Sequence, residues 1–150
     1  MPMSLTSQKA VIYHELSAIA RTAASLVEQV APGRRDAYWA TSALVACALA
    51  EIGGTATGVR GLLEGEPHFW LETEGFRVDI ARELYDDGPL VEPVGAWSGH
   101  AVYDRHLADW PLEDAVDHFA SLFDFPAISR QRARDIFDHI VGTFAHDRVA

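Results

Sequence analysis

Hydrophobic residues recur at three- and four-residue steps between residues 5 and 30, which predicts an amphipathic helix that ends at Pro32-Gly33. The apolar positions of this helix are Ile12, Leu16, Ile19, Ala23, Leu26 and Val30. The next segment, AYWATSALVACALAEI, is apolar on nearly every side, as expected of a buried helix. We expect Asp36 to be its N-cap and Gly53-Gly54 to end it.

Three short segments rich in β-branched and aromatic residues follow: ATGVRGLL, HFWLE and FRVDI. Because glycine-containing connections separate them, they predict an antiparallel meander packed on the buried helix. The stretch from Asp86 to Arg105 contains three glycines and two prolines, and it predicts a loop with one strand at LVEPV.

Helical spacing returns near the end of the chain. One helix is predicted to start at Asp109-Trp110-Pro111 and another at about Ser129. The inward-facing residues are Leu112, Val116, Phe119 and Phe123 in the first, and Ala133, Ile136, Phe137, Ile140 and Phe144 in the second. The fold class is therefore α+β: a buried helix packed on a small antiparallel sheet, with flanking N- and C-terminal helices.

Composition limits the domain organisation and the class of partner. A chain of 150 residues that is 49% hydrophobic predicts a single domain over residues 1–150, with a core at about 36–105 and C-terminal helices at about 109–148. The formal charge of −10 argues against nucleic acid and anionic membrane as partners and is compatible with a basic peptide or a small molecule. We find no signal peptide and no long apolar segment, and we expect a soluble, cytoplasmic protein.

The single cysteine, Cys47, excludes an internal disulfide and a cysteine-built zinc site. No HExxH or similar ligand spacing occurs, so we predict no metal. The glycines of GGTATGVRG lack phosphate-loop spacing and a lysine, so we expect no nucleotide and no other cofactor.

The hairpin HFWLETEGFRVDI carries a histidine near its start and an aspartate near its end. A turn centred near Thr73-Glu74 places His68 opposite Asp79, within reach of one another. A histidine whose one ring nitrogen is held by a carboxylate presents the other as a general base, as in a nucleophile–base–orienter triad. The alternative is a structural cross-strand ion pair.

A triad also needs a nucleophile, and a helix N-terminus is the most favourable place for a thiolate. The first turn after Asp36 reads Ala37-Tyr38-Trp39, whereas Cys47 lies ten residues later in an apolar run, where core packing is expected. Thr41 and Ser42 are hydroxyl alternatives without any surrounding signature.

The order of these segments resembles the transglutaminase-like branch of the papain-like cysteine hydrolases. That pattern has a cysteine opening a buried helix, then a turn and strand, a histidine in a motif close to HxWxE, and an aspartate in a motif close to V/I-D. Here DAYWATSALVACALAEIGG matches the helix, TATGVRG the strand, HFWLE the histidine motif and RVDI the aspartate motif. The match covers roughly residues 36 to 80. Each motif alone is weakly specific, and the specificity comes from their order and spacing together.

This sequence differs from the family pattern at the nucleophile, because Ala37 or a residue beside it occupies the position where the family has cysteine. Either the cysteine was changed to alanine to inactivate the enzyme, which we favour, or the chain is a natural pseudoenzyme. The resemblance implies that a thiolate at position 37 attacks an acyl carbon while His68 transfers the proton and Asp79 orients the imidazole. It also implies an oxyanion role for Gln29. We further expect Trp39, Trp70 and His100 to line the substrate pocket.

Two further functions stay open beside a cysteine hydrolase or acyltransferase acting on a peptide or amide bond. The leader peptidases of lasso-peptide maturation are similar in size and in their histidine motif, and they suggest peptide maturation. The first alternative is a non-catalytic module that binds a peptide in the same groove. The second is a helical interaction protein without catalysis, in which the hairpin pair is structural and a partner protein binds elsewhere.

Overall fold

The computed structural model describes residues 5–52, 56–63, 65–80, 90–94, 100–106 and 111–148. Within these residues the helices are α1 (Leu5–Val30), α2 (Arg35–Glu51), α3 (Leu112–Ala120) and α4 (Pro126–Arg148). The strands are β1 (Thr57–Leu63), β2 (Glu66–Thr73), β3 (Phe76–Asp79), β4 (Leu90–Pro93) and β5 (His100–His106). The predicted α+β class is confirmed.

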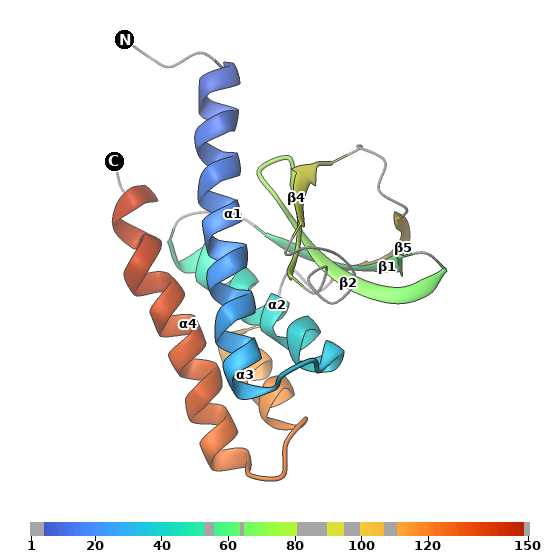
Figure 1. Cartoon of the computed structure of the whole chain (residues 1–150), viewed down its shortest axis with the longest axis vertical. Helices are drawn as coiled ribbons and strands as arrows, with labels where there is room; N and C mark the ends of the chain where they lie inside the picture. The colour runs from blue at the N-terminus through green and yellow to red at the C-terminus, as the bar shows by residue number, and fades with distance from the viewer. Residues whose placement is uncertain are drawn as a thin grey trace.

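The strands form one antiparallel sheet in the order β4-β3-β2-β1-β5. Figure 1 shows the sheet to one side of the helices, with α1 and α4 running alongside each other; α1 contacts β3 and β4, and α2 contacts β1 and β2. The predicted meander of three strands is confirmed as β1, β2 and β3, and β4 extends it at the LVEPV segment.

The α2 helix is the central element of the core, as its apolar sequence predicts. Its buried residues include Tyr38, Leu44, Val45 and Leu49, and α2 contacts every other helix as well as β1 and β2. The prediction that Asp36 caps this helix is wrong, because the N-cap is Arg34, which makes no side-chain capping bond. Asp36 instead lies in the first turn, where it binds the Arg34 guanidinium and where a carboxylate still complements the helix dipole.

One face of the sheet belongs to the core shared with the helices. Leu71 of β2, Val78 of β3 and Val91 of β4 pair across adjacent strands, and all three are buried in the same cluster as Leu16 and Ile19 of α1. Since side chains alternate along a strand, His68, Trp70, Arg77 and Asp79 lie on the opposite face. The sheet therefore separates the aliphatic core from a more polar face.

Two element boundaries differ from the sequence prediction. Residues 100–106 form β5 rather than a loop, because they pair with the edge of β1. This pairing joins segments that are distant in the sequence, and the charged residues Asp104 and Arg105 interrupt the hydrophobic pattern that would have predicted a strand. The last helix begins at Pro126, three residues before Ser129, since proline is well suited to the first position of a helix. The expected boundary residues Gly53, Gly54, Asp109 and Trp110 lie outside the described residues.

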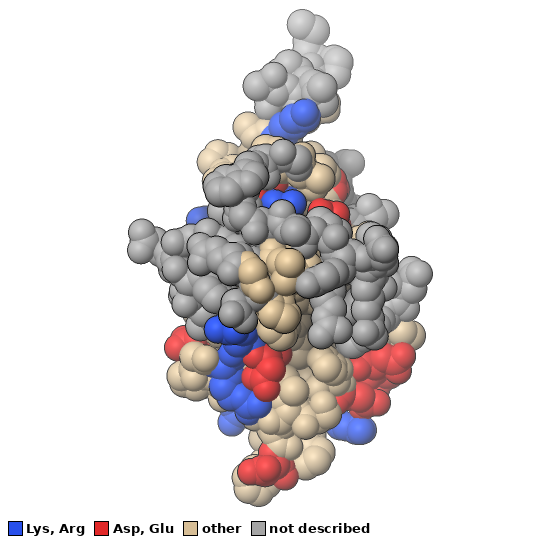
Figure 2. Space-filling model, turned by 90° about the vertical axis from the view of Figure 1, so that its right-hand side faces the viewer, with Lys and Arg blue, Asp and Glu red and all other residues tan. Residues whose placement is uncertain are grey.

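None of the described helices is both long enough and apolar enough to span a membrane. Figure 2 shows the face of the molecule on the sheet side, where basic and acidic side chains of the described residues lie next to one another in small mixed groups.

Candidate functional site: a buried histidine–aspartate pair

The histidine and the aspartate of the β2–β3 hairpin form a buried pair. Nε2 of His68 lies 2.8 Å from both Oδ1 and Oδ2 of Asp79, and neither side chain is exposed to solvent. Because an ionised carboxylate only accepts hydrogen bonds, this contact holds a proton on Nε2. Nδ1 is then the ring nitrogen that would take up a proton from a reacting group.

The two residues meet diagonally and not directly across the strands, so the predicted register is wrong. Thr73 pairs with Phe76 and Leu71 with Val78, and extending this register places Asp79 opposite Trp70. The turn is Glu74-Gly75, with φ of 51° and 84°, which suits a two-residue hairpin loop. The residue opposite Asp79 is therefore Trp70 and not His68, which is two positions away. Because side chains alternate with a period of two, His68 and Asp79 still lie on the same face of the sheet.

Two tryptophans and a glycine surround the imidazole. The ring centroid of Trp39, from the start of α2, lies 6.0 Å from that of His68 in an edge-on arrangement, and the centroid of Trp70 lies 6.3 Å away. The residue paired with His68 on β1 is Gly61, which contributes no side chain. The structure thus brings together four of the predicted site residues: His68, Asp79, Trp39 and Trp70.

The indole N–H of Trp39 is a buried hydrogen-bond donor for which the described residues offer no partner. Unsatisfied buried donors are uncommon in folded proteins and call for an explanation. This donor belongs to the indole whose ring lies edge-on to that of His68. The only sequence signal for this unsatisfied donor was the presence of a tryptophan in the first turn of a buried helix.

A second ion pair supports the tryptophan on the same sheet face, and sequence reasoning missed it. The guanidinium of Arg77 lies over the Trp70 ring at 5.3 Å, and its Nη1 lies 2.7 Å from Oε1 of Glu92. Arg77 and Glu92 pair directly across β3 and β4, and both side chains are largely buried. Opposite charges near the middle of two short strands were the available signal.

The predicted nucleophile position, Ala37, is fully buried and belongs to the core cluster. Ala37 and Trp39 are two residues apart on α2, and their side chains therefore point about 200° apart around the helix axis. The α2 side chain that contacts His68 is Trp39. Thr41 and Ser42, the hydroxyl alternatives, each donate to the backbone carbonyl four residues earlier, to Ala37 and Tyr38 respectively.

The remaining predicted site residues lie elsewhere. Gln29 lines a groove between α1 and α4 that contains no residue of β2 or β3, so the structure separates it from the His68–Asp79 pair. His100 begins β5, where its backbone pairs with Leu63, and not the loop that we expected; its side chain lies outside what the structure describes.

Cys47 is half-buried on α2, and its burial raises the pKa of the thiol, as expected for a packing residue. No group of three or more metal-ligating side chains occurs among the residues that the structure describes. The described arrangement therefore offers proton transfer by an oriented imidazole, together with a hydrogen-bond donor beside it.

No family model, no curated protein and no solved structure matches the chain.

Proposed function

We propose that His68 and Asp79 are the acid–base half of a cysteine hydrolase or acyltransferase site of the transglutaminase-like kind, which acts on a peptide or amide bond. The observation that carries this proposal is the contact of both Asp79 oxygens with Nε2 of a fully buried His68, beside the start of a buried helix. A carboxylate in this position fixes the tautomer and orients the ring of a general base.

In the intact form, a thiol in the first turn of α2 loses its proton to Nδ1 of His68 and attacks the acyl carbon. The C–N bond then breaks, and the imidazolium returns the proton to the leaving amine. Water or another amine attacks the thioester and releases the thiol. The N–H of Trp39 takes the oxyanion role that we had expected of Gln29, because it is an unsatisfied donor next to His68.

The chain itself has alanine at position 37, and we propose that it is therefore an inactivated form of such an enzyme. The His68–Asp79 pair survives intact while the thiol alone is missing. Peptide maturation of the kind performed by leader peptidases is one activity that this half-site would serve.

The second candidate is a non-catalytic module that binds a peptide at the same site. The burial of Ala37 in the core favours this candidate, because core packing alone accounts for an alanine at this position. In that case Trp39 and the His68–Asp79 pair would bind a peptide amide without chemistry.

A thiol scan at the start of α2 distinguishes the two candidates. In a Cys47→Ser background we would introduce cysteine separately at Asp36 and Ala37. The rate of alkylation by iodoacetamide would be measured from about pH 5 to about pH 10, a range that includes the ordinary thiol pKa of about 8.5. Ala50→Cys, at an exposed position near the end of the same helix, is the matched control for an ordinary thiol.

The proposal expects the pKa of one of the two introduced thiols to lie well below that of the Ala50→Cys control, and to rise toward it when His68 is also changed to alanine. Position 36 is three residues from Trp39 and shares its side of α2, whereas position 37 does not. A lowered pKa at 36 alone would move the nucleophile position by one residue and leave the enzyme class standing. Ordinary or unreactive thiols at both positions would sink the enzyme proposal and leave the binding module.

A further inference from the structure

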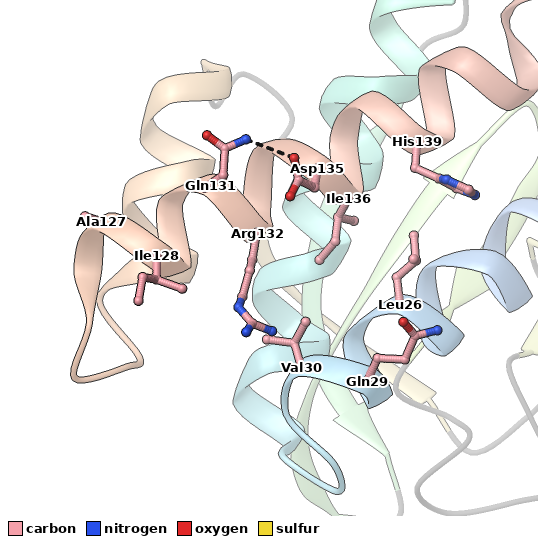
Figure 3. Close-up of a pocket in the computed structure, with 10 residues that line it drawn as sticks. All are labelled: Leu26, Gln29, Val30, Ala127, Ile128, Gln131, Arg132, Asp135, Ile136 and His139. Atoms are coloured by element: carbon pink, nitrogen blue, oxygen red, sulfur yellow. Dashed lines mark hydrogen bonds between the residues drawn. The ribbon is translucent and has the colours of Figure 1, made fainter.

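A groove runs between the C-terminal part of α1 and the first half of α4, on residues that the His68–Asp79 pair does not use. It has a volume of about 700 Å³ and continues into a smaller hollow further along α1. Figure 3 shows side chains from both helices reaching into it. The lining residues of the groove are Leu26, Gln29, Val30, Ala127, Ile128, Gln131, Arg132, Asp135, Ile136 and His139.

Both walls of the groove follow helical spacing. On α4 the lining positions include Ile128, Arg132, Ile136 and His139, which recur at steps of three and four residues and so form one stripe. At a rise of 1.5 Å per residue the stripe from residue 128 to residue 139 is about 16 Å long. The groove is thus about three helical turns in length, with two helices as its walls.

The apolar surface of the groove extends into solvent. Ile128 is 55% exposed and Phe125, just before α4, is 69% exposed, although both are large hydrophobic residues. Leu26 and Val30 of α1 are only partly buried against the core. Exposed apolar residues that gather beside a groove are typical of a surface that binds another protein.

The charge of the groove differs in sign from that of the chain. Arg130 and Arg134 of α4 pair with Asp117 and Glu113 of α3. Arg132, between them, extends toward Val30 of α1 in Figure 3, and within the described residues it has no ion pair.

Arg21, in the continuing hollow on α1, likewise has no ion pair within the part of the chain that the structure describes. The carboxylate of Asp135 accepts a hydrogen bond from Gln131. The groove and the hollow that continues it together carry two arginines against one aspartate, so this combined surface is basic, while the whole chain carries a formal charge of −10.

We propose that this groove binds an acidic amphipathic helix of a partner protein. A helix that lies along two others buries an apolar stripe at i, i+3, i+4 and i+7, which the floor formed by Leu26, Val30 and Ile136 would accept. Carboxylates beside that stripe would pair with Arg132 and Arg21, for which the described part of the chain shows no ion pair. This inference does not depend on the chemistry proposed for His68.

The test uses the full chain and synthetic peptides of about 14 residues, long enough to span about 16 Å as a helix. The probe peptide has leucines at i, i+3, i+4 and i+7 with glutamates beside them. One comparison peptide carries lysine in place of each glutamate, and another has the probe's composition in an order that breaks the stripe. Binding is followed by fluorescence anisotropy and located by amide chemical-shift changes.

The proposal expects the glutamate peptide to bind at least about tenfold more tightly than the lysine and scrambled peptides, with shifts confined to residues 21–30 and 125–139. Arg132→Glu should weaken binding by about tenfold or more, while Arg130→Glu, the same charge change two residues earlier, should have a much smaller effect. Ile128→Asp should also weaken it, whereas Val11→Asp, at a similarly exposed position (50%) of α1, should not.

Three results would overturn the proposal: equal binding of the three peptides, shifts outside the groove, or insensitivity to Arg132→Glu in a variant with unchanged circular dichroism. Concentration-dependent shifts of the groove residues in the absence of peptide would also count against it, because they would assign the groove to a second copy of this chain.

Discussion

His68 and Asp79 form a bidentate contact at 2.8 Å although they are not direct cross-strand partners. The imidazole reaches across the hairpin to a carboxylate two register positions away, in a place with no solvent exposure. Each member of the pair therefore stabilises the other inside the protein, whatever chemistry the pair performs.

A double-mutant cycle should reveal this dependence. His68→Leu removes the imidazole that contacts both oxygens of the buried Asp79 carboxylate, and we expect it to lower the free energy of unfolding by about 3–5 kcal/mol. The double variant His68→Leu/Asp79→Leu removes both polar groups and should be more stable than the sum of the single changes predicts, by at least about 1 kcal/mol. Urea unfolding followed by circular dichroism measures each free energy.

The exposed pair of Arg134 and Glu113 is the matched control for that cycle. Its side chains are 44% and 62% exposed and lie 2.7 Å apart, so its coupling should be below about 1 kcal/mol. Equal coupling energies in the two cycles would contradict the role that we assign to burial.

Two glycines should respond to alanine in opposite directions. Gly75 has a φ of 84° in the hairpin turn, a conformation that a β-carbon disfavours, so Gly75→Ala should lower the free energy of unfolding by about 1–2 kcal/mol. Gly142 lies within α4, and a β-carbon there would meet no atom within 4 Å. Gly142→Ala should therefore raise the free energy of unfolding by about 0.5–1 kcal/mol. Thermal melts of both variants check the two signs, and a stabilising Gly75→Ala would contradict the observed turn.

Glu28 should make stability depend on pH at the connection between α1 and α2. The Tyr38 hydroxyl, and then the Gly33 N–H, donate to its carboxylate and hold its pKa below the ordinary value. A lowered pKa in the folded state means that this contribution is present above the unfolded pKa and is lost as the pH falls through the folded pKa. Glu28→Gln should therefore be destabilising at pH 7 and much less so at about pH 2.

Urea unfolding at the two pH values tests this expectation, with Glu51→Gln, at an exposed position at the end of α2, as a comparison. A Glu28→Gln effect of the same size at both values would rule out the linkage.

Cys47 should behave as a protected thiol. Its burial raises its pKa, so alkylation by iodoacetamide at pH 8 should be slower in the folded chain than in urea, where the thiol is exposed. Mass spectrometry of quenched samples gives both rates. Equal rates would mean that the α2 helix opens as fast as the reagent reacts.

The hydrophobic pattern predicted most of the fold because the elements concerned are long or strongly periodic. The helix over residues 5–30 agrees with α1, and the apolar run after Asp36 agrees with the buried helix α2. The pattern failed at β5, where strand formation depends on the free edge of β1, and at the Asp36 cap, where a neighbouring residue takes the position.

The sequence by itself determined that His68 and Asp79 share one face of a hairpin, because side chains alternate with a period of two and any register of the correct parity keeps them together. Only the tertiary structure decided that they meet diagonally, that Trp39 rather than Ala37 faces the imidazole, and that Gln29 lies in a separate groove. These outcomes depend on the turn type and on the rotation of α2 and α1 against their neighbours. Packing between distant segments sets that rotation, and local sequence patterns do not encode it.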